Sequence, residues 1–181
     1  INLIGGAKLK HFFKPEELFD IIDIKQDMIV LDAGCGQGDI SESISQYVSK
    51  VISVDQDEES IDILKNKNIK NINAVIGDIN NIEFIDNSLI DICFLINVLH
   101  GFVANKEKNA IDELKRVIKK NSQLVIVEFK KDASIGPPKE IKLSKEEVKN
   151  IFSQFEEKAY KEFEFHYEIV SNLIQSKIHV L

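Results

Sequence analysis

The feature that most constrains this chain is a glycine-rich segment that directly follows a short apolar run. Residues 29–38 read Ile-Val-Leu-Asp-Ala-Gly-Cys-Gly-Gln-Gly, and helical periodicity begins at Ile40. An apolar run, a glycine turn and a helix in immediate succession are typical of the first unit of a parallel α/β sheet. Glycines let the backbone turn tightly and approach a ligand, while the first amides of the helix lack partners within it. The segment therefore predicts a ligand-binding loop at the end of a buried strand.

The alternation of apolar run and helical pattern continues along the chain. Strands are expected at residues 28–31, 51–54, 73–76, 89–96 and 123–129, and helices at 40–48, 57–64, 107–120 and 144–152. In the last part, Phe163, Phe165, Tyr167 and Ile169 alternate with Glu162, Glu164, His166 and Glu168, which predicts two antiparallel strands within 155–170. We therefore expect one α/β domain over 1–181, of the Rossmann-like, doubly wound type. Residues 1–24 would form a helical cover, and 130–143 an irregular loop that contains Pro137 and Pro138.

Composition excludes several classes of protein. The chain has 181 residues, of which 44% are apolar, so it can bury a core without covalent support. Two cysteines cannot build a disulfide scaffold or a four-thiolate zinc site. A formal charge of −7 disfavours nucleic acid as a partner, although residues 105–150 carry 12 Lys and Arg against 8 acids. Apolar runs of membrane-span length and signal-peptide patterns are absent, so we expect a cytoplasmic protein with no membrane span.

The glycine loop differs from the common phosphate-binding loops. A dinucleotide fingerprint that begins at Gly34 and Gly36 requires its third glycine at residue 39, where Asp39 stands. The Gly-Lys-Ser/Thr ending of a nucleoside triphosphate loop is also missing. Asp32 and Asp39 would repel a pyrophosphate. The loop therefore favours a ligand that is adenosine-like and cationic rather than phosphorylated.

Three acids follow the first three expected strands at equal intervals. Asp32, Asp55 and Asp78 are each separated by 23 residues, which is the length of one strand–helix unit. The carboxyl ends of neighbouring parallel strands share one edge of a sheet, and open α/β sheets bind their ligands there. Three carboxylates at this edge favour hydroxyl groups, amines and a sulfonium cation over phosphate.

From about residue 14 to 170 the chain resembles the class I S-adenosylmethionine-dependent methyltransferases. The resemblance is strongest to their small-molecule group, which includes ubiquinone- and menaquinone-biosynthesis enzymes. Residues 30–38 match the first motif of the family, whereas Asn121-Ser122 stands where the family usually has Pro-Gly-Gly before the fifth strand. The resemblance implies a seven-stranded, mostly parallel sheet with an antiparallel edge strand, and a loop at 130–143 near the methyl acceptor.

The resemblance also implies roles for individual residues. Asp55 would bind both ribose hydroxyls, Asp78 the adenine amino group, and the backbone amide of Ile79 the adenine ring. Asn97 would line the methionine end, while Asp32 would act either on the ligand amine or only on the loop amides. The full set expected to contact S-adenosylmethionine is Asp32, Gly34, Cys35, Gly36, Gly38, Asp55, Gln56, Asp78, Ile79 and Asn97.

The expected function is transfer of a methyl group from S-adenosylmethionine to a small molecule. His100 is the candidate general base, because it follows the fourth strand closely and neutral imidazole accepts protons near pH 7. Packing against the substrate is its alternative role. Cys35 and Cys93 are expected to be structural, and the sequence shows no metal-ligand motif. A non-catalytic S-adenosylmethionine-binding module and an RNA or protein methyltransferase stay open as alternatives, and the protein would act as a monomer or homodimer.

Overall fold

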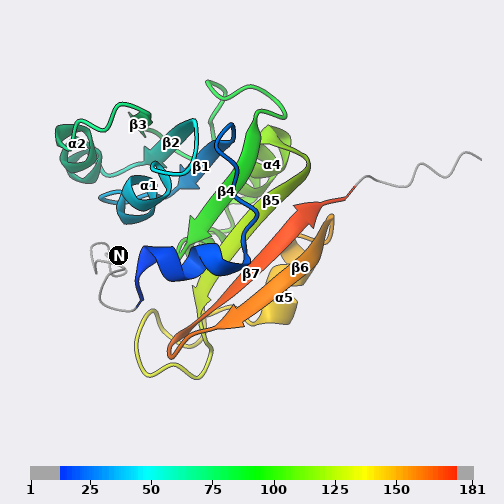
Figure 1. The fold of residues 1–181 in the computed structure, drawn as a ribbon. Helices are drawn as coiled ribbons and strands as arrows, with labels where there is room; N and C mark the ends of the chain where they lie inside the picture. Colours follow the sequence, from blue (N-terminus) through cyan, green and yellow to red (C-terminus); the bar gives the residue numbers. More distant parts are fainter. Residues whose placement is uncertain (1–12, 175–181) are drawn as a thin grey trace, which may run out of the picture.

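The apolar runs of the chain form a single seven-stranded sheet in the computed structural model, which describes residues 13–174 (Figure 1). The strand order is β3-β2-β1-β4-β5-β7-β6. The strands are β1 Ile29–Ala33, β2 Lys50–Asp55, β3 Ile72–Ile76, β4 Ile90–Ile96, β5 Ile118–Phe129, β6 Phe155–Glu162 and β7 His166–Leu173. Strands β1 to β5 are parallel, and β7 is antiparallel to both β5 and β6. The predicted doubly wound, mostly parallel sheet is therefore confirmed.

Two apolar layers cover the two faces of the sheet. One layer contains Leu31, Cys93 and Leu124 from the sheet and is covered by α3 (Leu99–Ala104), α4 (Lys108–Val117) and α5 (Lys145–Ile151). The other contains Val30, Phe94 and Val127 and is covered by α1 (Asp39–Ile44) and by η2, a 3-10 helix at Pro15–Ile21. In Figure 1, η2 lies in front of the sheet and α4 behind it. Neighbouring residues of β4 face opposite layers, which explains why this strand is almost continuously apolar.

Several elements differ from the sequence-based expectation. The helix expected over 107–120 ends at Val117, and Ile118 begins β5 because it pairs with Ile90 at the start of β4. The helix expected at 40–48 ends at Ile44. The short helix α3 was not predicted, and the expected cover at 1–24 is described only from residue 13, as η2.

The C-terminal part adds two antiparallel strands, β6 and β7, to one edge of the sheet, as predicted. The turn between β6 and β7 is held by a hydrogen bond from the Phe163 amide to the His166 carbonyl (2.9 Å). Residues 130–143 form an irregular loop, which Lys142 braces through a bond from Nζ to the Ala133 carbonyl (2.6 Å).

The remaining helix, α2 (Glu58–Asn66), connects β2 with β3. Between residues 13 and 174, no helix combines the length and the apolar character that a bilayer crossing requires.

Candidate active site

The glycine loop lies at the carboxyl edge of the sheet, where β1 passes into α1. The amides of Gly34 and Cys35 both donate to the Val54 carbonyl of β2 (2.8 and 3.1 Å). The amide of Gly36 donates to the Asp55 carboxylate (Oδ2, 2.7 Å). The loop is therefore fixed to the end of the neighbouring strand by three backbone donors.

Two glycines of this loop have different surroundings. Gly38 has a φ of 80°, and a Cβ placed on it would lie 2.4 Å from a Leu64 methyl carbon of α2. Gly36 has a φ of 50°, and within residues 13–174 a Cβ there would meet no atom within 4 Å apart from its own chain neighbours. Gly38 is therefore required by packing, whereas Gly36 faces open space at the edge where a ligand can approach the backbone.

Asp55 is held in place by backbone donors on both of its carboxylate oxygens. Oδ2 accepts from the Gly36 amide, and Oδ1 accepts from the Asp57 amide (2.9 Å). Asp57 in turn caps α2, because its Oδ2 accepts from the Ser60 amide (3.1 Å). An ionised carboxylate has about four acceptor positions, so Asp55 can still accept two hydroxyl groups from a ligand.

Asp32 is buried and anchors the start of α1. Its Oδ2 accepts from the Ser41 amide (3.1 Å) and from the Ser41 hydroxyl (2.5 Å), which lies 2.7 Å from the Ser53 hydroxyl. Burial raises the pKa of Asp32 to about 6; the Ser41 hydrogen bonds oppose this shift, and the nearby Asp55 and Asp39 carboxylates add to it. These two hydrogen bonds support the second of the two roles expected for Asp32, which is to position the loop and helix.

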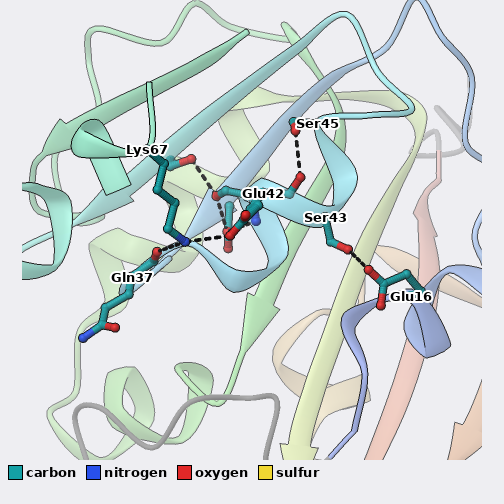
Figure 2. Close-up of polar contacts among 9 residues, drawn as sticks. Glu16, Gln37, Glu42, Ser43, Ser45 and Lys67 are labelled. Carbon is teal, nitrogen blue, oxygen red and sulfur yellow. Dashed lines mark hydrogen bonds and ion pairs between the residues drawn. The ribbon is translucent and has the colours of Figure 1, made fainter. Parts of the chain in front are cut away.

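Figure 2 shows how side chains around α1 connect the loop to its neighbours. Lys67, just after α2, donates to the Gln37 carbonyl (3.0 Å) and forms an ion pair with Glu42 (2.8 Å). On the other side of α1, the Ser43 hydroxyl donates to the Glu16 carboxylate of η2. These contacts therefore connect the glycine loop with α1, α2 and η2.

Asp78 and Ile79 follow β3 at the same edge. Asp78 is exposed, and its Oδ1 accepts from the backbone amide and the side-chain amide of Asn80 (both 2.8 Å). The side chain of Ile79 is buried in the core, so only its backbone is available to a ligand. Phe84, which the sequence reasoning did not single out, is 52% exposed and lies beside Gly77. Gln56 is exposed directly after Asp55.

At the end of β4, Asn97 has a left-handed backbone with a φ of 57°. Its amide donates to the Val127 carbonyl of β5 (2.8 Å). Its side-chain oxygen is buried and has no hydrogen-bond partner among the described residues. A buried acceptor without a donor is unusual in proteins, which marks this oxygen as a candidate ligand contact.

His100 lies in α3 and is buried against Glu128 of β5. Its Nδ1 is 2.7 Å from Glu128 Oε2, and its backbone amide donates to Glu128 Oε1 (3.2 Å). A carboxylate at this distance accepts a hydrogen from Nδ1, and the neutral imidazole tautomer with its hydrogen on Nδ1 has its lone pair on Nε2. Glu128 was missed by the sequence reasoning, although an acid in the apolar run 124–129 was a visible signal.

The two cysteines are poor candidates for nucleophiles. Burial raises the pKa of the Cys35 thiol well above its ordinary value, and the Asp32 and Asp55 carboxylates add to the shift. Burial also raises the pKa of Cys93, which lies in β4 and is buried in the hydrophobic core. Both thiols stay protonated at neutral pH. Within residues 13–174, no group of three His, Cys, Asp or Glu side chains is arranged to hold a metal ion.

Comparisons with known proteins bear on the family and the fold of the chain. Residues 31–126, just over half of the chain, match the family described as "Methyltransferase domain". The fold is similar to a SAM-dependent methyltransferase from Aquifex aeolicus, with a TM-score of 0.82 and 25% identity over 94% of this chain and 95% of that one.

Two curated relatives are longer than this chain. The chain is 28% identical over 155 residues to an uncharacterized protein, MJ0638, of Methanocaldococcus jannaschii, which covers 82% of this chain but 60% of that protein. It is 36% identical over 73 residues to an rRNA adenine N-6-methyltransferase of Bacillus licheniformis, covering 40% of this chain and 25% of that protein.

Proposed function

The chain belongs to the methyltransferase domain family, and from this premise we propose that it transfers a methyl group from S-adenosylmethionine to a small-molecule acceptor. The observation that carries the proposal is the open face of Gly36 beside a carboxylate, Asp55, that two backbone amides hold in place. This arrangement suits a ligand with a ribose and a positive charge, and it lacks the lysine that phosphate-binding loops use.

The residues at the sheet edge fit S-adenosylmethionine. Asp55 would accept the two ribose hydroxyls, and the exposed Asp78 would accept the adenine amino group beside the Ile79 backbone. Asn97, whose buried oxygen has no donor in the part of the chain that the structure describes, would face the methionine end. Gly34, Cys35, Gly36, Gly38 and Gln56 would contact the ligand through the loop, with Asp32 supporting them from behind.

When bound, S-adenosylmethionine supplies a methyl group on a sulfonium, which is a good leaving group for in-line displacement. The protein then mainly has to orient the acceptor and exclude water. His100 would accept at Nε2 the proton that the acceptor loses, and Glu128 would stabilise the imidazolium that results. Glu128 Oε1 also accepts from the backbone amide of His100, which holds the backbone that carries the ring.

The direct test is incubation of the protein with S-adenosylmethionine labelled in the methyl group and with cell extract, followed by fractionation by size. We expect label in a low-molecular-mass fraction. A non-catalytic binding module would bind the cofactor and leave every fraction unlabelled, which would contradict the proposal.

A second candidate is methylation of RNA, which the similarity of 73 residues to an rRNA adenine methyltransferase supports. The same labelling experiment distinguishes it, because label would then appear in RNA. The net charge of −7 favours the small-molecule acceptor. A location in the cytoplasm and a monomeric or homodimeric state remain predictions of the same proposal.

A further inference from the structure

Glu168 is the most unusual ionisable group outside the site described above. It lies in β7, its side chain is fully buried, and neither of its carboxylate oxygens has a hydrogen-bond partner among the described residues. Buried polar groups in native proteins are almost always paired, and an unpaired one needs a physical explanation such as a missing ligand.

The neighbours of Glu168 do not pair with it. It lies opposite Val127 of β5 and Lys161 of β6. The Lys161 ammonium is instead bonded to the Glu17 carbonyl and to the Asp20 carboxylate (2.8 Å), both in η2. Burial raises the pKa of Glu168 to about 8, with Lys161 opposing the shift and Asp20 adding to it.

Glu168 is separated from the candidate cofactor edge by one strand, β5, and lies on the face of the sheet that η2 covers. Its cross-strand partner Val127 accepts the amide hydrogen of Asn97, the residue that follows β4 at the candidate cofactor edge. Asn97 also carries a buried side-chain oxygen that no described residue donates to. Asn97 and Glu168, whose acceptor atoms have no partner within residues 13–174, therefore lie on the two sides of β5. A ligand with N–H or O–H donors would pair with either of them.

Aromatic rings lie between Glu168 and the edge of the sheet. His166 is on the same face of β7, and its ring lies 4.0 Å from that of Phe129 and 5.3 Å from that of Phe13. Phe13 also contacts Phe163, with ring centroids 5.0 Å apart. Burial, with the nearby Lys130 and Lys142, lowers the pKa of His166 to about 4, so this ring is neutral at pH 7. Neutral aromatic rings beside a carboxyl group are the combination that binds organic cations.

We propose that Glu168 and these rings, the acceptor subsite, bind an ammonium or similar N–H donor group of the methyl acceptor. The inference rests on the proposed function, since it names the acceptor class as organic amines. Glu168 is a binding residue in this proposal, because it holds the acceptor and takes no part in the methyl transfer itself. An apolar side chain would suit its layer better in the absence of such a ligand, because its cross-strand partner Val127 and Val170, two residues along β7, both belong to an apolar core cluster.

The test compares two probes of nearly equal shape, benzylamine and benzyl alcohol. Binding is measured by calorimetry, both with and without saturating S-adenosylhomocysteine. We expect the wild type to bind benzylamine at least about tenfold more tightly, because a hydrogen bond to a charged group contributes that much. Binding should also release protons, since the ammonium favours ionised Glu168.

Glu168→Gln and Glu168→Met should both lose the preference for benzylamine and the proton release, and thermal melting checks that each is folded. Glu164→Gln is the matched control, since Glu164 is an exposed acid in the adjoining turn and its removal should change neither quantity. Equal binding of the two probes by the wild type, or a preference retained in the Glu168 variants, would overturn the inference. Absence of methyl transfer would instead count against the proposed function, because these readouts measure binding alone.

Discussion

Glu128 holds His100 at two points, the ring nitrogen Nδ1 at 2.7 Å and the backbone amide at 3.2 Å. Both residues are buried, with 7% of His100 and 1% of Glu128 exposed. A carboxylate that fixes both the backbone and the ring of a histidine determines which nitrogen is free to accept a proton. The pair therefore has the geometry of a base and its orienting group.

His100→Ala should lower kcat by about a hundredfold with little effect on cofactor binding, because general-base catalysis typically contributes about 10²–10⁴-fold. Glu128→Gln should also lower kcat, because its single amide oxygen can accept from the ring or from the backbone amide of His100 but not from both. The neutral amide also no longer stabilises a positive charge on the ring. Steady-state kinetics with the identified acceptor measures both effects. If only KM rises in His100→Ala, the histidine is a wall of the acceptor site and no base is used.

The main elements of this fold could be predicted from the sequence because their hydrophobic periods are clear. The end of α4 was predicted too late, because residues 118–120 continue a helical pattern while the pairing of Ile118 with Ile90 draws them into β5. The helix α3 was missed because six residues carry too little periodicity. In each case a tertiary contact decided a boundary that local preference left open.

For the site as well, sequence spacing predicts some of the residues, whereas others are brought together only by tertiary contacts. The spacing of Asp32, Asp55 and Asp78 was enough to place three acids at one edge. The contact between His100 and Glu128 depends on how β5 continues past the end of β4, which spacing alone does not give. The alternating pattern of β7 predicts that Glu168 lies on a polar face of the strand. In the structure η2 covers that face, and Glu168 is buried.

Asp55→Ala should weaken S-adenosylhomocysteine binding by at least about tenfold, because each hydrogen bond to a charged group contributes about 1.5–3 kcal/mol. Calorimetry measures the affinity, and the melting curve shows whether the loop still folds without its anchor for the Gly36 amide. Asp62→Ala, which removes an exposed acid from α2, is the control for a general change in charge. Unchanged affinity in Asp55→Ala would show that this carboxylate serves only the turn.

Alanine substitutions at Gly36 and Gly38 should have separable effects. Gly38→Ala should destabilise the fold by about 1–3 kcal/mol, because the new methyl meets Leu64 and the backbone has a positive φ. Gly36→Ala has room for its methyl in the protein and should cost only about 1 kcal/mol of backbone strain. Its methyl would point into the space through which the ligand approaches the backbone. In Gly36→Ala the loss of cofactor-binding free energy should therefore exceed the loss of folding free energy. Denaturant unfolding measures the stability of both variants, and calorimetry measures their cofactor affinity. The same loss of affinity in Gly36→Ala and Gly38→Ala would contradict this assignment.

S-adenosylhomocysteine at ten to a hundred times its Kd should stabilise the protein by about 1.4–2.7 kcal/mol, which appears as a higher Tm. NAD and ATP should have little effect, because the loop has Asp39 in place of the third glycine and lacks a phosphate-binding lysine. A larger rise in Tm with NAD than with S-adenosylhomocysteine would contradict the cofactor assignment.

The stability of the protein should respond to pH through Glu168. Its pKa is about 8 in the folded protein against an ordinary value of 4.5, so the folded state keeps a proton that the unfolded chain loses. The free energy of unfolding should therefore decrease as pH rises from about 4.5 to about 8, by roughly 3 kcal/mol at pH 7, and level off above the folded pKa. Glu168→Gln removes this titration, so its stability relative to wild type should increase with pH. Urea unfolding of both proteins at about pH 6 and pH 8.5 measures the change, with Glu164→Gln as the control for lost surface charge. A stability difference between Glu168→Gln and wild type that is the same at both pH values would show that Glu168 titrates normally and that its burial costs the fold nothing.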